Sequence, residues 1–201
     1  MTAIVLDNVD EKRRRLLLIA TSAAAGVAGA GVAVPFLASW LPSARSLAAG
    51  APVEADISHV ELGQQITVEW RGKPVWILRR TPEMLELLPK HDALLVDPDS
   101  KESEQPAYVK GPQRSIKPEV FIATGVCTHL GCSPTLKKEI GAASDMGGEW
   151  PGGYYCPCHN SRFDLSARVF KGSPAPKNLV IPPHRYASDA VVVIGEDTQG
   201  A

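Results

Sequence analysis

Cys127-Thr-His129-Leu-Gly-Cys132 and Cys156-Pro-Cys158-His159 are the two short boxes that decide the fold of this chain. They contain all four cysteines of the protein and two of its five histidines, so its thiol chemistry takes place here. Two thiolates and two imidazoles suit a [2Fe–2S] cluster in which two histidines replace two cysteines on one iron. The other two thiols are then free to pair with each other.

The charge of such a cluster explains why the ligand type matters. Two ferric ions are balanced by two sulfides and two thiolates, whereas four thiolates would leave the oxidised cluster dianionic. The mixed set therefore accepts an electron more readily and has a higher reduction potential. The second nitrogen of an imidazole can gain or lose a proton as the cluster changes redox state. Such a centre can carry an electron and a proton together.

A structural zinc site is the alternative to iron, because zinc also binds two cysteines and two histidines. Zinc knuckles usually place like ligands together, as C-x₂₋₄-C and H-x₃₋₅-H. Here each box mixes the two types, as Cys127-x-His129 and Cys156-x₂-His159, so each box can give one ligand to each iron. A disulfide scaffold with incidental histidines is disfavoured, because all six residues fall into two boxes.

The boxes resemble those of Rieske proteins, C-T-H-L-G-C and C-P-C-H-G-S. More narrowly, they resemble the iron–sulfur subunit of the cytochrome bc1 complex (ubiquinol–cytochrome c reductase) of bacteria. The resemblance runs from the basic N-terminus through Trp70-Arg-Gly-Lys-Pro74 to Gly172-Ser-Pro-Ala-Pro176. It implies Cys127 and Cys156 on the buried iron, His129 and His159 on the outer iron, Ser161 as a donor to a bridging sulfide, and a disulfide between Cys132 and Cys158.

The resemblance also implies an activity, the one-electron oxidation of ubiquinol in a membrane complex of the respiratory chain. His159 would accept a hydrogen bond from the quinol hydroxyl and take up its proton, and His129 would be the other ligand at the solvent edge. Leu130 and Pro174 would contact the subunit that forms the quinol site. The chain has no C-x-x-C-H haem motif. The implied partners are therefore cytochrome b and cytochrome c1, in a dimeric, proton-translocating bc1 complex.

Two residues depart from the family pattern. The glycine after the second histidine is Asn160 here, and asparagine tolerates a left-handed backbone better than most residues. The family often has a tyrosine two residues after Ser161 that donates to a cysteine ligand; here it is Phe163. The loss of one donor to the sulfurs predicts a lower reduction potential than in relatives with tyrosine.

The N-terminal segment predicts a membrane anchor. Residues 1–15 end in Lys12-Arg-Arg-Arg15, and the uncharged run that follows, 16–41, exceeds the roughly 20 residues that cross a bilayer. The basic cluster places the N-terminus in the cytoplasm and the rest in the periplasm, across the inner membrane of a bacterium. The Arg13-Arg14-Arg15-Leu16-Leu17 sequence also resembles a twin-arginine export signal.

A cleaved signal peptide is the alternative to an anchor, with Ser46-Leu-Ala48 as a possible processing site. Signal peptides have apolar regions of about 7–15 residues, and this one is longer, which favours an uncleaved anchor. Residues 42–52 form an Ala-rich linker, which in bc1-type relatives lets the head swing between two docking positions. Alanine could instead make this linker partly helical.

Residues 53–201 predict one antiparallel β domain, mainly β, with the cluster-binding part inserted at about 124–176. Strand patterns occupy 65–70, 75–78, 120–124 and 190–194, and Arg71-Gly-Lys-Pro74 is expected to turn the first hairpin. Thr81 and Pro82 predict a helix start that ends near Pro89. Gly147, Gly148, Gly152 and Gly153 predict a surface excursion between the boxes. The net charge of −1 gives no sign of nucleic-acid binding.

Two other functions carry the same type of cluster. One is the small Rieske subunit of an arsenite-oxidase-type periplasmic enzyme, which shares twin-arginine export. The long anchor and the two outer stretches of resemblance argue against it. The other is a soluble ferredoxin of a ring-hydroxylating dioxygenase, which lacks both an anchor and the extra cysteine pair.

Overall fold

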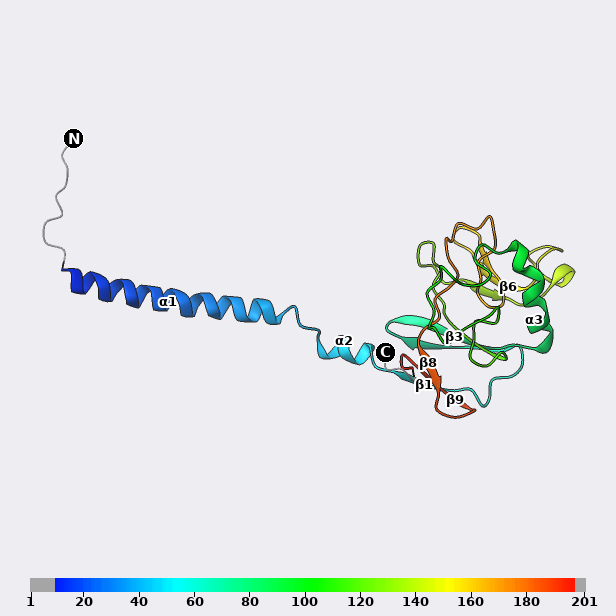
Figure 1. The fold of residues 1–201 in the computed structure, drawn as a ribbon, viewed down its shortest axis with the longest axis horizontal. Helices are drawn as coiled ribbons and strands as arrows, with labels where there is room; N and C mark the ends of the chain where they lie inside the picture. Colours follow the sequence, from blue (N-terminus) through cyan, green and yellow to red (C-terminus); the bar gives the residue numbers. More distant parts are fainter. Residues whose placement is uncertain (1–9, 198–201) are drawn as a thin grey trace, which may run out of the picture. The chain divides into compact units, whose positions relative to one another are not determined.

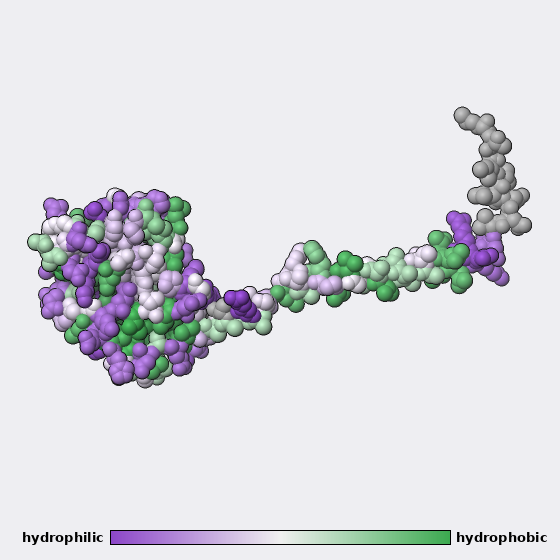
Figure 2. Space-filling view, turned by 180° about the vertical axis from the view of Figure 1, so that it is seen from behind, coloured by the Kyte–Doolittle hydropathy of each residue, from purple (hydrophilic) through white to green (hydrophobic). Residues whose placement is uncertain are grey.

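The N-terminal unit is built around one long helix. The computed structural model describes residues 10–197 and divides the chain into two compact units between Leu47 and Ala48. Helix α1 (Glu11–Ala38) begins at Asp10, whose carboxylate accepts the backbone N–H groups of Lys12 and Arg13 at 3.0 and 3.2 Å. The helix is long and apolar enough to cross a membrane, and Figure 2 shows its mostly green and white surface.

The expected linker contains a second, short helix. Helix α2 (Ala44–Ala49) lies inside residues 42–52, so the linker is partly helical, the alternative that its alanines favour. Helix α1 starts five residues before the expected apolar run because Asp10 caps it, and it includes the basic cluster.

The described part of the C-terminal unit contains three antiparallel sheets of three strands each. Figure 1 shows β1, β8 and β9 of one sheet close together. Their strand orders are β1-β9-β8, β2-β3-β4 and β5-β6-β7. The strands are β1 (Val53–Asp56), β2 (Gln65–Trp70), β3 (Lys73–Arg79), β4 (Val120–Thr124), β5 (Thr135–Lys137), β6 (Gly153–Cys156), β7 (Ser161–Phe163), β8 (His184–Tyr186) and β9 (Val191–Ile194). The mainly β, antiparallel fold predicted from the sequence is confirmed.

Strand β3 separates two hydrophobic cores. Val75 and Ile77 pack with residues of β1 and β9, whereas Trp76 and Leu78 pack with residues of β6 and β7. Successive side chains of a strand point to opposite faces. The apolar run in β3 is therefore buried on both faces. The sheet β2-β3-β4 lies between the core that it shares with β1 and β9 and the core that it shares with β6 and β7.

The hairpin and the helix appear where the sequence predicts them, with one correction. The turn is shorter than expected: only Arg71 and Gly72 have positive φ, at 53° and 69°, and Lys73 already pairs with Trp70. A two-residue turn of this kind matches the twist of its strands. Helix α3 (Pro82–Leu87) starts as predicted, with the Thr81 hydroxyl accepting the N–H of Met84, and continues as a 3-10 helix (Leu88–Leu94).

The segment between the boxes is less of a surface excursion than expected. Gly147 and Gly148 are exposed, but Gly152 and Gly153 are buried. A Cβ on Gly153 would lie 1.9 Å from the backbone oxygen of Phe163, so glycine is needed where β6 passes this close to β7. Trp150 is also buried, and its Nε1 donates to the oxygen of Lys137 at 2.8 Å.

Candidate metal centre

Both boxes fold into the same kind of closed turn. The N–H of Gly131 donates to the oxygen of Cys127 at 3.0 Å, and the N–H of Asn160 donates to the oxygen of Cys156 at 3.0 Å. In each turn the residue four positions after the first cysteine is left-handed, with φ of 85° at Gly131 and 63° at Asn160. Asn160 thus adopts the backbone that its family glycine would, as expected.

The two free thiols are buried and face each other. Cys127 and Cys156 are only 3% and 2% exposed, and both are outside the disulfide. Burial raises the pKa of the Cys127 thiol, and the nearby Cys156 raises it further, while the N–H of His129 and the Ser161 hydroxyl lower it. These donors are placed to stabilise a thiolate that has left water, which is the state in which cysteine binds metal.

The two imidazoles lie next to each other on the outer side of the boxes. The ring centroids of His129 and His159 are 4.8 Å apart, edge to face. His159 is exposed and His129 is half-buried. Leu130, the residue after His129, is 71% exposed, so the first box places an apolar side chain in water.

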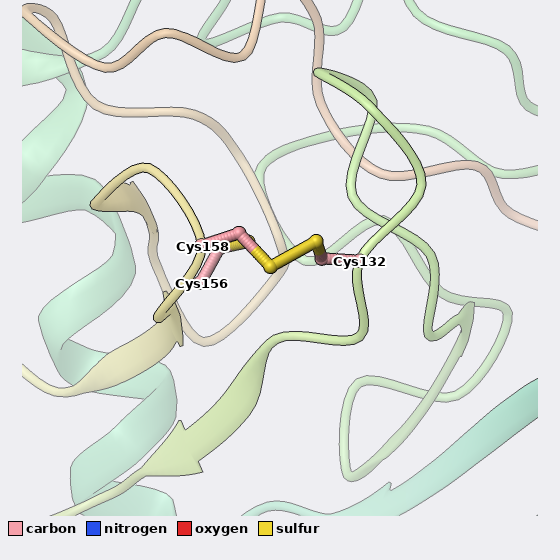
Figure 3. Close-up of side chains that lie close together, drawn as sticks. All are labelled: Cys132, Cys156 and Cys158. Carbon is pink, nitrogen blue, oxygen red and sulfur yellow. A yellow bond between two sulfur atoms is a disulfide. The ribbon is translucent and has the colours of Figure 1, made fainter.

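Cys132 and Cys158 form a disulfide, the pair that the resemblance implies. It joins the first box to the second across 26 residues of chain. Figure 3 shows this bond with Cys156 beside it, and the three sulfur atoms lie within 4.8 Å of one another. Those three do not form a metal site together, because two of the sulfurs are used by the disulfide and offer no thiolate.

A third loop closes over the boxes. The hydroxyl of Thr128 donates to the oxygen of Lys177 at 2.6 Å, and the N–H of Ala175 donates to the Ser161 hydroxyl at 3.1 Å. The Ser173 hydroxyl accepts the N–H of Arg162 at 3.0 Å. The loop is therefore bonded to the first box through Lys177 and to the start of β7, directly after the second box, through Ser173 and Ala175, and Pro174 is exposed.

The second box is also held by a side chain from β6. The hydroxyl of Tyr155 donates to the side-chain oxygen of Asn160. This bond depends on asparagine, because glycine has no side-chain acceptor. The residue that departs from the family pattern thus adds a contact at the turn next to His159.

A network of buried arginines holds residues 164–168, which follow β7, against neighbouring segments. Arg168 and Asp164 are fully buried and joined at 2.8 Å, and Arg168 also donates to the oxygen of Leu88 at 2.7 Å. Arg114 donates to the oxygens of Ser166, Ala167 and Leu179. Burial lowers the pKa of Arg80 and of Arg114 to about 10, so both remain charged near neutral pH.

The sequence identified the thiols and imidazoles but not this support. The buried arginines, the Thr128–Lys177 bond and the Tyr155–Asn160 bond were missed. Only the Asp164–Arg168 pair carried a local signal, because opposite charges four residues apart often pair.

The donor set fits a cluster held by two sulfurs and two nitrogens. Two buried thiols and two adjacent imidazoles remain once the disulfide has used the other two cysteines. The sulfurs lie inside and the nitrogens outside, which matches a site with one buried and one accessible metal ion.

Comparison with known proteins identifies the family. Residues 52–183 match the family described as "Rieske [2Fe-2S] domain", and residues 6–43 match "Ubiquitinol-cytochrome C reductase Fe-S subunit TAT signal". The chain is 59% identical over 194 residues to the ubiquinol-cytochrome c reductase iron-sulfur subunit of Allochromatium vinosum, covering 96% of this chain and 93% of the relative.

One further curated relative and one solved structure also match. The corresponding subunit of Bradyrhizobium diazoefficiens is 41% identical, with 91% of this chain and 94% of the relative covered. A solved structure described as "Hyperthermophilic respiratory Complex III" matches with a TM-score of 0.46 and 23% identity, over 87% of this chain and 97% of that chain.

Proposed function

This chain belongs to the Rieske iron–sulfur subunits of ubiquinol–cytochrome c reductase, and we propose that His159 and His129 perform its reaction with quinol. It is a subunit of an oxidoreductase complex that oxidises quinol, and its cofactor is one [2Fe–2S] cluster. The named relatives favour this function over an arsenite-oxidase-type subunit.

Cys127 and Cys156 hold the inner iron and His129 and His159 the outer iron in this proposal. The observation that carries it is the arrangement of the four groups, with two buried thiols in contact and two imidazoles 4.8 Å apart on the outer side. When bound, the cluster supplies a one-electron acceptor. Ser161 supports it by directing its hydroxyl into the site, and its oxygen is fixed by the N–H of Ala175.

His159 is the group that touches quinol. It is exposed, so its nitrogen that does not bind iron can accept a hydrogen bond from the quinol hydroxyl and then take its proton. His129 occupies the neighbouring position and is half-buried. Because the imidazole takes up the proton as the electron leaves, the oxidised quinol does not have to carry a positive charge.

Leu130 and Pro174 form the apolar part of the docking surface in this proposal. Both are exposed, Leu130 next to His129 in the first box and Pro174 on the third loop. Their burial against cytochrome b would contribute about 25 cal/mol per Å² of apolar area and exclude water from the proton transfer. The head then carries its electron to cytochrome c1, in a dimeric, proton-translocating complex.

The subunit is membrane-anchored through α1, the one helix among residues 10–197 that is long and apolar enough to cross a membrane. We place its N-terminus in the cytoplasm and its head in the periplasm of a bacterial inner membrane, because Lys12-Arg-Arg-Arg15 precedes the apolar run. The mass of the protein extracted from membranes should equal that of the uncleaved chain. A mass that corresponds to a shorter chain beginning near Ala48 would contradict the anchor.

Replacement of His159 tests the proposed ligand and its role together. The His159→Ala variant should lose the electron paramagnetic resonance (EPR) signal of a mixed-ligand cluster and the reduction by quinol. The Leu130→Ala variant is the control, because it should keep the signal while the Michaelis constant for quinol or the docking rate changes. A retained mixed-ligand signal in His159→Ala would overturn the assignment.

A further inference from the structure

A third sulfur lies beside the disulfide. The Sγ atoms of Cys132, Cys156 and Cys158 all lie within 4.8 Å of one another, and Figure 3 shows Cys156 next to the bond. A disulfide bond is about 2.05 Å long, so to form one with Cys132 the sulfur of Cys156 has to close a separation of at most 4.8 Å to that length. Such proximity makes an intramolecular reaction far faster than attack by a thiol in solution.

We propose that Cys156 is the nucleophile of an internal thiol–disulfide exchange site, blocked only while this residue binds iron. The thiolate of Cys156 attacks Sγ of Cys132, the Cys132–Cys156 bond forms, and the Cys132–Cys158 bond breaks. Cys158 leaves as a thiolate and takes up the proton that Cys156 gave to water. No electrons are gained or lost, so the step needs no oxidant or reductant. The blocking by iron rests on the proposed ligand role of Cys156.

The two residues that exchange places differ in exposure. Cys158 is exposed, so its released sulfur lies in water and is open to reagents, whereas Cys156 is only 2% exposed. The new bond would close a loop only two residues shorter than the existing one, so loop entropy gives no preference for either bond. Attack on Cys158 instead would bridge Cys156 and Cys158 across the single residue Pro157, whose ring restricts the backbone.

Through this exchange, loss of the cluster would change which cysteine is bonded to Cys132. Once Cys156 is in a disulfide, only Cys127 remains as a thiol on the inner side of the site, and the exposed Cys158 thiol becomes open to modification. A chain without its cluster would therefore lose its ability to rebind one until the exchange runs backward. This function is separate from quinol oxidation.

Native alkylation of two matched variants tests the exchange. Full-length Cys127→Ser and Cys156→Ser both lack one proposed iron ligand, but only the first keeps the proposed nucleophile. Each is treated with iodoacetamide without oxygen, quenched with acid, and mapped by mass spectrometry of its peptides. Cys127→Ser should carry the label on Cys158 and a Cys132–Cys156 bond, with at least tenfold more label on Cys158 than Cys156→Ser has.

The position of the label decides the outcome. Label on Cys156 with an intact Cys132–Cys158 bond would overturn the proposal, as would equal labelling of Cys158 in the two variants or label on Cys132.

A second variant covers the case in which Cys127→Ser does not fold. His159→Ala removes an exposed ligand, keeps all four cysteines and should show the same label on Cys158. The wild-type protein with its cluster should stay unlabelled at Cys158. If His159→Ala keeps the mixed-ligand EPR signal, the proposed ligand set fails, whereas labelling of Cys127→Ser tests the exchange independently.

Discussion

Ser161 and Phe163 lie two positions apart on β7, and only Ser161 has a side-chain hydroxyl that can donate a hydrogen bond. Both are fully buried, and the Phe163 ring packs in the same hydrophobic core as Cys127 and Cys156. Ser161 supplies a hydroxyl to this site and Phe163 supplies none. The presence or absence of a single hydroxyl therefore controls how strongly the site stabilises the negative charge that reduction adds.

The Phe163→Tyr variant should raise the reduction potential. A new hydroxyl that donates to a cysteine sulfur stabilises the reduced form, by about 1 kcal/mol or roughly 40 mV for a one-electron couple. Protein-film voltammetry measures the midpoint. Phe163→Leu is the control for altered packing and should not raise it. An unchanged or lower midpoint in Phe163→Tyr would contradict this role of the missing hydroxyl.

At the scale of elements, the disulfide adds a covalent link between the two box loops, which the chain otherwise connects through β5 and β6. The Cys132→Ala/Cys158→Ala double variant should lose about 3 kcal/mol of stability in the chain-entropy model. The loss should appear as faster release of the cluster in urea, followed by its visible absorbance. Ser133→Ala, next to the disulfide, is the control. Equal release rates in the double variant and the control would show that the bond does not stabilise the loops.

The linker that contains α2 is expected to act as a tether. A polyproline insert between Gly50 and Ala51 should stiffen it and slow quinol turnover, because such segments are extended and semi-rigid. A Gly/Ser insert of equal length is the control and should retain more activity. The EPR signal should be unchanged in both proteins. Normal turnover with the polyproline insert would contradict a swinging head.

At the scale of the whole molecule, His184 links the stability of the head to pH. It is only 2% exposed, its Nδ1 lies 2.8 Å from the oxygen of Pro182, and burial lowers its pKa below 6.5. The unfolded chain therefore takes up a proton as the pH falls below about 6.5, while the folded chain does not. The contribution of His184 to the free energy of unfolding is therefore full above this pH and is lost as the pH falls below it. Burial also lowers the pKa of His91, so this residue likewise lowers the free energy of unfolding as the pH falls.

The His184→Gln variant tests this linkage. Its unfolding temperature should fall less steeply between pH 7 and pH 5 than that of the wild type, because one titrating group has been removed. Differential scanning calorimetry on the two proteins gives the slopes. Identical slopes would show that His184 does not carry the pH dependence.

The whole molecule also shows what the sequence could and could not predict. Strand β2 was predicted from its alternating pattern, and β3 and β4 from short runs of β-branched, aromatic and other apolar residues. Strands β5 and β7 are only three residues long and show no period, so they were missed. The boxes were identified because cysteine and histidine have distinctive chemistry. Arg80, Arg114 and Arg168 were not, because charged residues are expected on the surface and only the fold brings their partners together.

Nitrogen coordination of the outer iron is the central claim, and pulsed EPR of the reduced protein containing ¹⁵N-histidine tests it most directly. The account predicts strong hyperfine coupling to two histidine nitrogens, from His129 and His159, in a protein that contains iron and acid-labile sulfide. A spectrum without directly coupled nitrogen, or a protein that contains zinc in place of iron and sulfide, would contradict it.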